Sequence, residues 1–239
     1  MAIHHSELIQ LGSLTIDELA DHYEAPATWV RSNMAISLDG HFVDSHGSSR
    51  GLSSELDVTI LLLLRAISDV VVVGGATARQ ERYAPKQPRH EFAHLSPAPP
   101  RLCVVSRNLD FQLSDPLFQQ DISQPIIVTE DSADVLWQER VAALEGVADI
   151  EVMPRVNGAA LIACLAERSL NSVISEGGPF MQELLRRDEV LDEMAVTIAP
   201  VIIGASSGMS AFGSLKGQLE LQAVARDGDH TYARFLVQR

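Results

Sequence analysis

Short apolar runs rich in β-branched residues alternate along the chain with longer segments whose apolar positions recur every three to four residues. The first pattern predicts strands and the second predicts helices. Strands are predicted at Trp29–Ser37, Asp69–Val73, Leu102–Ser106, Pro125–Thr129, Ile150–Met153, Ser172–Ser175 and Met194–Ile203. Helices are predicted at Ser54–Ile67, Ala133–Leu144, Ala159–Glu167 and Pro179–Arg187.

The last part of the sequence has a different pattern. The runs Leu219–Ala225 and Thr231–Val237 flank the turn sequence Arg226-Asp-Gly-Asp, which predicts an antiparallel hairpin. By contrast, the four valines within Asp69–Val73 lack polar alternation, as is typical of a parallel strand buried on both faces. The sequence therefore predicts an α/β fold with a mixed, mostly parallel sheet, helices on both faces and a C-terminal antiparallel hairpin.

The pattern predicts one domain, over residues 29–239, preceded by an N-terminal extension over residues 1–28 with a helix around Ile16–Tyr23. Ser54 and Asp57 have the spacing of an N-terminal helix cap. The segment Arg82–Arg101 contains five prolines and little periodicity, so it is predicted to be a long loop. A functional lid and an inert insertion are both open for it.

Composition narrows the possible partners. The chain has 239 residues, 46% of them hydrophobic, and a formal net charge of −14 without any Lys/Arg run. This charge argues against nucleic acid or an anionic membrane as the partner, whereas a few local arginines and backbone N–H groups suffice for a phosphorylated small molecule. The longest apolar runs are too short to span a bilayer.

The chain has two cysteines, Cys103 and Cys164, and both lie in apolar runs, as expected of reduced core residues in a cytoplasmic protein. The N-terminus has no basic segment followed by an apolar core, so no signal peptide is expected. No Cys/His cluster has zinc spacing, and no metal site is expected.

Two glycine pairs follow buried strands and precede helices. One is Glu176-Gly-Gly-Pro and the other is Gly74-Gly75, with Thr77 just beyond it. A turn of this kind exposes backbone N–H groups at a helix N-terminus, which suits a phosphate, and two such turns suggest a dinucleotide. Neither turn has the G-x-G-x-x-G or the P-loop pattern. The alternative is that both pairs only make tight turns.

Four motifs in order carry a family resemblance. They are Asn-Met-Ala-x-Ser-Leu-Asp-Gly at 33–40, Leu-Arg-Ala-x-Ser-Asp at 64–69 leading into the Gly74-Gly75 turn, Glu-Gly-Gly-Pro at 176–179, and Leu-Asp-Glu-Met-Ala-Val-Thr-Ile-Ala-Pro-Val-Ile-Ile-Gly at 191–204. Together they resemble the reductase domain of riboflavin biosynthesis, a branch of the dihydrofolate-reductase-like superfamily. The resemblance covers residues 29–239.

The resemblance implies a dihydrofolate-reductase-like fold and an NADPH-dependent oxidoreductase. Members of this family reduce 5-amino-6-(5-phosphoribosylamino)uracil to its ribitylamino form, and they usually form homodimers. In many bacteria the domain is fused to a zinc deaminase, whose H-x-E and P-C-x-x-C motifs do not occur here, so deamination is not expected. A same-fold NADPH reductase of another heterocyclic or carbonyl substrate, and a nucleotide-binding protein without catalysis, remain alternatives.

The resemblance also implies site residues. NADPH would contact Ala35, Ile36, Gly74, Gly75, Thr77, Ser106, Arg107, Gly177, Gly178, Pro179 and Phe180. Arg107 would meet the 2′-phosphate of the cofactor, unless it is a solvated surface arginine. Asn33, Ser53 and Glu81 would bind the substrate, and Asp192 and Glu193 would mark a helix-to-strand junction.

Glu176 is the expected catalytic acid, because the reaction needs a proton when the hydride arrives. It could instead bind substrate hydroxyls or brace the glycine turn. One segment departs from the family pattern: Glu81 takes the place of an aspartate and Tyr83 that of a proline. This departure leaves the substrate open, with Arg79 or Arg82 as replacement contacts for its phosphate.

Overall fold

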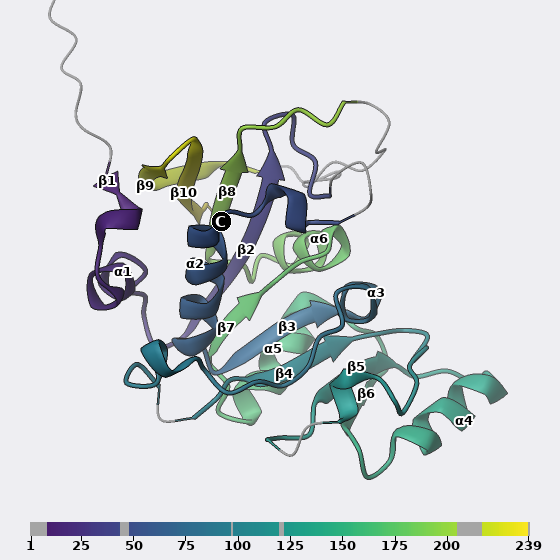
Figure 1. Ribbon diagram of the computed structural model, residues 1–239. Helices are drawn as coiled ribbons and strands as arrows, with labels where there is room; N and C mark the ends of the chain where they lie inside the picture. The colour runs from purple at the N-terminus through teal and green to yellow at the C-terminus, as the bar shows by residue number, and fades with distance from the viewer. Residues whose placement is uncertain (1–8, 44–47, 97, 120–121, 205–216, 239) are drawn as a thin grey trace, which may run out of the picture.

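The computed structural model describes residues 9–43, 48–96, 98–119, 122–204 and 217–238. These residues build a ten-stranded sheet in the order β1-β9-β10-β8-β2-β7-β3-β4-β5-β6 (Figure 1). The strands are β1 (Ile9–Gln10), β2 (Trp29–Ser37), β3 (Val70–Gly74), β4 (Arg101–Val105), β5 (Ile126–Glu130), β6 (Asp149–Met153), β7 (Ser172–Ser175), β8 (Glu193–Ala199), β9 (Leu219–Asp227) and β10 (His230–Val237).

Every strand pair in this sheet is parallel except the two that involve β10, which runs antiparallel to both β8 and β9. β9 and β10 form the predicted C-terminal hairpin, with Gly228 at a φ of 53° in its turn. The predicted fold class is therefore confirmed.

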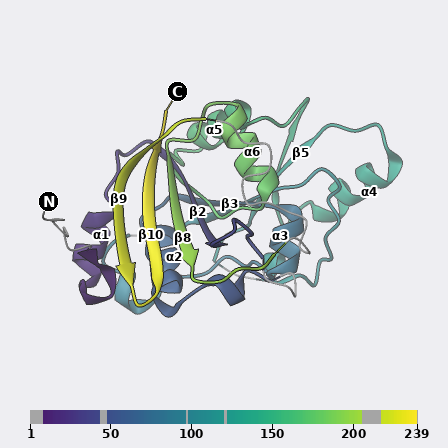
Figure 2. The ribbon, with the colours of Figure 1, turned by 90° about the horizontal axis from the view of Figure 1, so that it is seen from above.

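Helices cover both faces of the sheet, as Figures 1 and 2 show from two directions. The α-helices are α1 (Ile16–His22), α2 (Glu55–Ala66), α3 (Gly75–Gln80), α4 (Val135–Leu144), α5 (Gly158–Glu167) and α6 (Pro179–Arg187). Short 3₁₀ helices lie at Leu11–Ser13, Arg50–Leu52, His90–Phe92 and Pro116–Phe118. Within the described residues, no helix is both long enough and apolar enough to span a bilayer.

The valines of β3 show how the sheet divides the core. Val71 and Val73 face the cluster built with α1, α2 and α4, while Val70 and Val72 face the cluster built with α5 and α6. Successive side chains of a strand point to opposite faces, so an all-valine strand fills both clusters.

Most predicted elements lie within two residues of their observed bounds, and β2, β7 and α6 have the bounds that were predicted. The prediction for Met194–Ile203 was wrong at its end: β8 stops at Ala199. Pro200 follows, and a proline has no N–H group to offer the ladder. The predicted long loop is anchored by Phe92, which is fully buried.

Residues 9–28 are packed on the rest of the chain. β1 pairs in parallel with β9, and Leu11, Leu19 and Tyr23 belong to the same buried cluster as α2. The predicted N-terminal extension therefore shares its core with the predicted domain.

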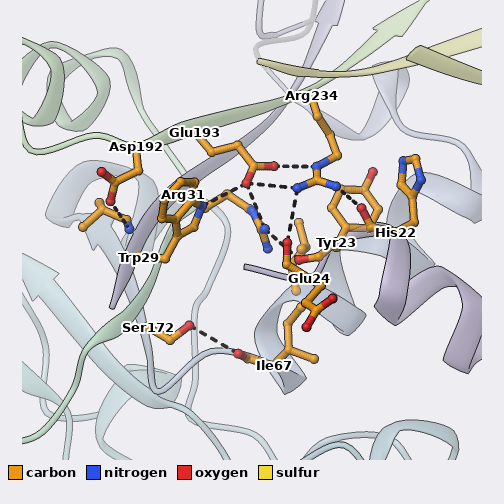
Figure 3. A network of polar contacts seen from close by, with 12 residues as sticks. His22, Tyr23, Glu24, Trp29, Arg31, Ile67, Ser172, Asp192, Glu193 and Arg234 are labelled. Carbon is orange, nitrogen blue, oxygen red and sulfur yellow. Dashed lines mark hydrogen bonds and ion pairs between the residues drawn. The ribbon is translucent and has the colours of Figure 1, made fainter. Parts of the chain in front are cut away.

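The amino-terminal end of the sheet is held by a buried ion cluster around Glu193 (Figure 3). Arg234 donates from Nε to Glu193 Oε1 at 2.7 Å, and Arg31 donates from Nη2 to Oε2 at 2.9 Å. The indole of Trp29 also donates to Oε2, at 2.9 Å. Burial by itself raises the pKa of Glu193, but the two arginines outweigh it and the pKa lies below its usual value. Together with Asp192, which accepts from the backbone N–H of Val30, this cluster supports the predicted junction role.

The carboxyl ends of β2, β7, β3 and β4 meet at the opposite edge. β7 lies between β2 and β3, so the chain order of the strands reverses there. Ligands of open α/β sheets bind in the crevice at such a switch point.

Candidate active site

The two glycine turns lie side by side at this switch point. The backbone N–H of Gly74 donates to the carbonyl of Gly177 at 3.5 Å, and the backbone N–H of Glu176 donates to the carbonyl of Val72 at 3.0 Å. Gly74-Gly75 leads from β3 into α3, and Gly177-Gly178 leads from β7 into α6.

Glycine is required in both turns. Gly178 has a φ of 38°, and a Cβ on it would lie 2.9 Å from Thr77 Oγ1. A Cβ on Gly75 would lie 2.8 Å from the side chain of Ser106. These distances are shorter than real Cβ contacts, so a side chain at either position would displace Thr77 or Ser106.

A cleft of about 520 Å³ opens between the turns, and we call it the glycine cleft. Its lining includes most of the predicted cofactor residues, namely Gly74, Gly75, Thr77, Ser106, Arg107, Gly177, Gly178, Pro179 and Phe180. The N-terminus of α6, which begins at Pro179, points the positive end of its dipole toward the same place. The cleft therefore has the chemistry of an anion-binding groove.

Arg107 lies at the rim of the glycine cleft. Its Nε is 3.3 Å from Glu130 Oε2, and its guanidinium is 5.5 Å from the ring centroid of Phe180. The side chain remains 63% exposed, so a phosphate can reach it from solvent.

A second cavity, of about 150 Å³, adjoins the cleft and shares Thr77, Gly177, Gly178 and Pro179 with it. We call it the central cavity. The predicted residues that line it are Asn33, Ala35, Ser53, Glu81 and Glu176. Ile36, predicted to contact the cofactor, is buried in β2 and lines neither space.

The carboxylate of Glu176 accepts three hydrogen bonds. Arg65 donates to both of its oxygens, from Nε and Nη2, at 2.5 Å each, and the Tyr83 hydroxyl donates to Oε2 at 2.6 Å. The Glu176 side chain is only 2% exposed. Burial, and then the charge of Glu176, raise the pKa of Tyr83 well above its usual value, so its hydroxyl keeps its proton.

Arg65 and Tyr83 were not predicted as site residues. Both had a signal in the sequence, because Arg65 belongs to the second motif and Tyr83 is the departure from the family pattern. Asp57 was interpreted only as part of a helix cap. Ser54 does cap α2, accepting from the N–H of Asp57 at 3.0 Å, but the Asp57 side chain lines the central cavity.

A third cavity, of about 460 Å³, lies on the other side of Tyr83, and we call it the basic pocket. Arg50, Arg82 and Lys86 line it, and it shares Ser53 and Tyr83 with the central cavity. Arg79, the other arginine considered for a phosphate, instead lines the glycine cleft.

An open α/β sheet thus carries a glycine-lined groove at its switch point, and this groove adjoins a second cavity. Residues 28–231 match the RibD C-terminal domain, and the chain belongs to that family.

Similar proteins carry related names. The chain is 29% identical over 187 residues to the chloroplastic riboflavin biosynthesis protein PYRR of Arabidopsis thaliana, with 78% of this chain and 30% of that protein covered. It is 26% identical over 184 residues to the 2,5-diamino-6-ribosylamino-4(3H)-pyrimidinone 5′-phosphate reductase of Archaeoglobus fulgidus, with 74% and 82% covered. Some curated relatives are therefore much longer than this chain.

Among solved structures, a pyrimidine reductase-like protein from Corynebacterium diphtheriae superposes with a TM-score of 0.84 at 24% identity. The match covers 95% of this chain and 100% of the other. This likeness confirms the fold expected from the four motifs.

Proposed function

We propose that this protein is an NADPH-dependent reductase of riboflavin biosynthesis. It converts a phosphoribosylamino-pyrimidine, such as 5-amino-6-(5-phosphoribosylamino)uracil, to the ribitylamino form. The observation that carries the proposal is the junction of the glycine cleft and the central cavity at Thr77, Gly177 and Gly178. A dinucleotide held in the first space would have its reactive end close to a small ring held in the second.

The residues of the glycine cleft fit NADPH, because the glycines of its two turns carry no side chain that would keep a phosphate from the backbone. When bound, the cofactor supplies a hydride for the C1′ carbon of the substrate. Gly75, Gly178 and the N-terminus of α6 would hold the pyrophosphate, and Arg107 would pair with the 2′-phosphate. Ala35, on β2, would offer backbone groups at the end of the cleft that opens into the central cavity.

The substrate would occupy the central cavity and the basic pocket together. Asn33 and Ser53 would offer hydrogen bonds to the pyrimidine and its ribose chain. The phosphate would lie among Arg50, Arg82 and Lys86. Within the described part of the chain, the acidic residues that line this pocket are Glu55 and Glu81. The substrate would therefore be recognised by a ring site and a separate charge site.

The contacts of Glu176 favour one of its expected roles over another. A carboxylate that accepts three hydrogen bonds, two of them from an arginine, is an acceptor and a poor proton donor. We therefore propose that Glu176 fixes Arg65 and Tyr83 at the cavity wall and accepts from substrate hydroxyls.

The test uses purified protein with NADPH and the phosphoribosylamino-uracil, following NADPH oxidation and identifying the ribitylamino product. We expect turnover, and growth rescue of a riboflavin auxotroph that lacks this reductase. The dephosphorylated substrate serves as the internal control, and its kcat/KM should be much lower if the basic pocket holds the phosphate. Binding of NADPH without turnover of the pyrimidine would point to another substrate.

We further propose a cytoplasmic homodimer. Buried, unpaired Cys103 and Cys164 suit a reducing compartment. Leu38, Val201 and Ile202 are exposed near one another, with the N–H of Leu38 bonded to the carbonyl of Val201, and they offer an apolar surface for a second copy. Light scattering on the purified protein measures its mass in solution and tests the dimer.

A further inference from the structure

Asp57 is a buried carboxylate that the proposed reaction has not yet used. It lies in the first turn of α2, it is only 5% exposed, and it lines the central cavity. Its Oδ1 is inaccessible to solvent and has no hydrogen-bond partner among the residues that the structure describes. A buried carboxylate oxygen without a donor costs free energy, so such a group is a candidate ligand contact.

A comparison within the chain shows that helix capping does not account for this carboxylate. Glu18 occupies the same third position in α1, and its Oε2 accepts from the backbone N–H of Thr15 at 2.8 Å, which completes a capping box. In α2 the corresponding hydrogen bond, from the backbone N–H of Ser54 to the Asp57 carboxylate, is not formed, so only the Ser54 side chain caps the helix. The Asp57 side chain is thus left for the cavity.

The surroundings leave the charge of Asp57 uncompensated. No ion pair with Asp57 exists within the described ranges, and Arg65 is occupied by Glu176, which lines the central cavity. A ligand edge that presents two neighbouring N–H donors would satisfy the carboxylate once its side chain rotates to turn Oδ1 toward the cavity, because a carboxylate is an acceptor only.

The pyrimidines that fit the proposed function differ in the number of neighbouring N–H donors on the ring edge that contains N3. A 2-aminopyrimidin-4-one presents its N3–H and its exocyclic 2-amino group side by side, and both are donors. A uracil presents N3–H between two carbonyl oxygens, and a carbonyl facing a carboxylate is repelled. We propose that Asp57 is a specificity-determining residue, which binds the N3 and 2-amino edge and makes the protein prefer a 2-aminopyrimidinone ribosylamine phosphate over its uracil counterpart. This inference rests on the proposed reductase function.

The experiment compares kcat/KM for 2,5-diamino-6-ribosylamino-4(3H)-pyrimidinone 5′-phosphate and 5-amino-6-(5-phosphoribosylamino)uracil, with saturating NADPH. We expect the wild type to prefer the 2-amino compound by about 10- to 100-fold, the scale of one hydrogen bond to a charged group. Asp57→Asn keeps the shape and offers an amide N–H to the 2-carbonyl. It should remove that preference while leaving NADPH affinity unchanged.

The matched control is Glu18→Gln, which alters the carboxylate at the same helical position outside the cavity. It should lower the melting temperature slightly and keep the wild-type preference. Equal use of both pyrimidines by the wild type would overturn the inference, and this result does not depend on whether a variant folds. An equal loss of both activities in Asp57→Asn would also overturn it. If the wild type reduces neither pyrimidine, the reductase proposal itself fails, and the role of Asp57 fails with it.

Discussion

Tyr83 replaces the proline of the family pattern and adds a donor to the wall of the central cavity. Its hydroxyl donates to Glu176 at 2.6 Å, and the guanidinium of Arg65 lies 5.4 Å from its ring centroid. Because burial raises the pKa of Tyr83 well above 10, the hydroxyl remains a donor throughout the neutral and mildly alkaline range. The departure from the family pattern therefore adds to the polar network instead of weakening it.

Tyr83→Phe removes this donor and keeps the ring. We expect kcat/KM for the pyrimidine to fall by about 10- to 100-fold, because Glu176 loses one of three charged hydrogen bonds and its carboxylate gains freedom. The loss should appear mainly in kcat, with NADPH affinity unchanged. Steady-state kinetics and a cofactor titration measure the two effects separately.

Tyr232→Phe is the matched control, since that hydroxyl bonds Ser54 at 2.7 Å and Tyr232 lines none of the three cavities. It should reduce stability without a comparable loss of kcat. Normal kinetics in Tyr83→Phe would mean that Tyr83 only closes the wall. Tyr83→Phe is a cleaner probe than Glu176→Gln, which would leave the guanidinium of Arg65 partly buried without its partner.

Arg107 carries the predicted preference for the phosphorylated cofactor. Arg107→Ala should weaken NADPH binding by about 10- to 100-fold and leave NADH binding nearly unchanged, because the two cofactors differ only in the 2′-phosphate. Calorimetric titration of both cofactors provides the measurement, with NADH as the control. If the wild type binds NADPH and NADH equally, Arg107 pairs only with Glu130.

At the scale of elements, the sequence predicts the strands, the helices and both glycine turns, because each depends on a local pattern. The contacts within the site, by contrast, join residues that are far apart in the sequence. Arg65 and Glu176 are 111 residues apart, and their pairing depends on β7 inserting between β2 and β3. The helix cap predicted from Ser54 and Asp57 is correct for the N–H of Asp57, which donates to Ser54. It does not account for the side chain of Asp57, which lines the central cavity. Contacts of this kind can be predicted only when the order and register of the strands in the sheet are known.

The second glycine turn gives a prediction at this scale. Gly178→Ala should raise the Kd for NADPH by at least about tenfold, because the new Cβ would displace Thr77. It should also lower stability by about 1–3 kcal/mol, the cost of a side chain in a backbone conformation reserved for glycine. Calorimetry and thermal unfolding separate these effects.

Gly146→Ala is the control for the backbone cost alone. Gly146 has a φ of 83° and nothing within 4 Å of its Cβ position, in a turn that lines none of the three cavities. This variant should lose stability and bind NADPH as the wild type does. The turn would be purely structural if Gly178→Ala matched it in both measurements.

At the scale of the whole molecule, one end of the sheet is placed for ligand binding and the other end contributes to stability. The carboxyl ends of the central strands border the glycine cleft and the central cavity, and the amino ends hold the ion cluster of Glu193, Arg31 and Arg234. The cluster joins β2, β8 and β10 with the backbone of Tyr23 and His22, so it ties the N-terminal segment to the hairpin (Figure 3). Stability and ligand binding should thus be separable by mutation.

Glu193 gives the last prediction. Its pKa lies below the usual 4.5 in the folded state, so the folded protein binds fewer protons than the unfolded chain. The stabilisation is complete above pH 4.5 and is lost as the pH falls through the lowered pKa. Glu193→Gln leaves two buried arginines without their counter-charge, and it should cost about 3–5 kcal/mol at neutral pH. Because no carboxylate remains to be protonated, its stability should also depend less on pH below 4.5 than that of the wild type.

Thermal unfolding between acidic and neutral pH measures both effects, with a glutamine replacing the exposed Glu139 of α4 (Glu139→Gln) as the control that keeps the wild-type profile. If Glu193→Gln is too unstable to purify, the wild-type profile alone remains informative. Constant wild-type stability through the acidic range would contradict the depressed pKa. Variants that fold should bind NADPH normally, because the cluster lies at the end of the sheet away from the glycine cleft.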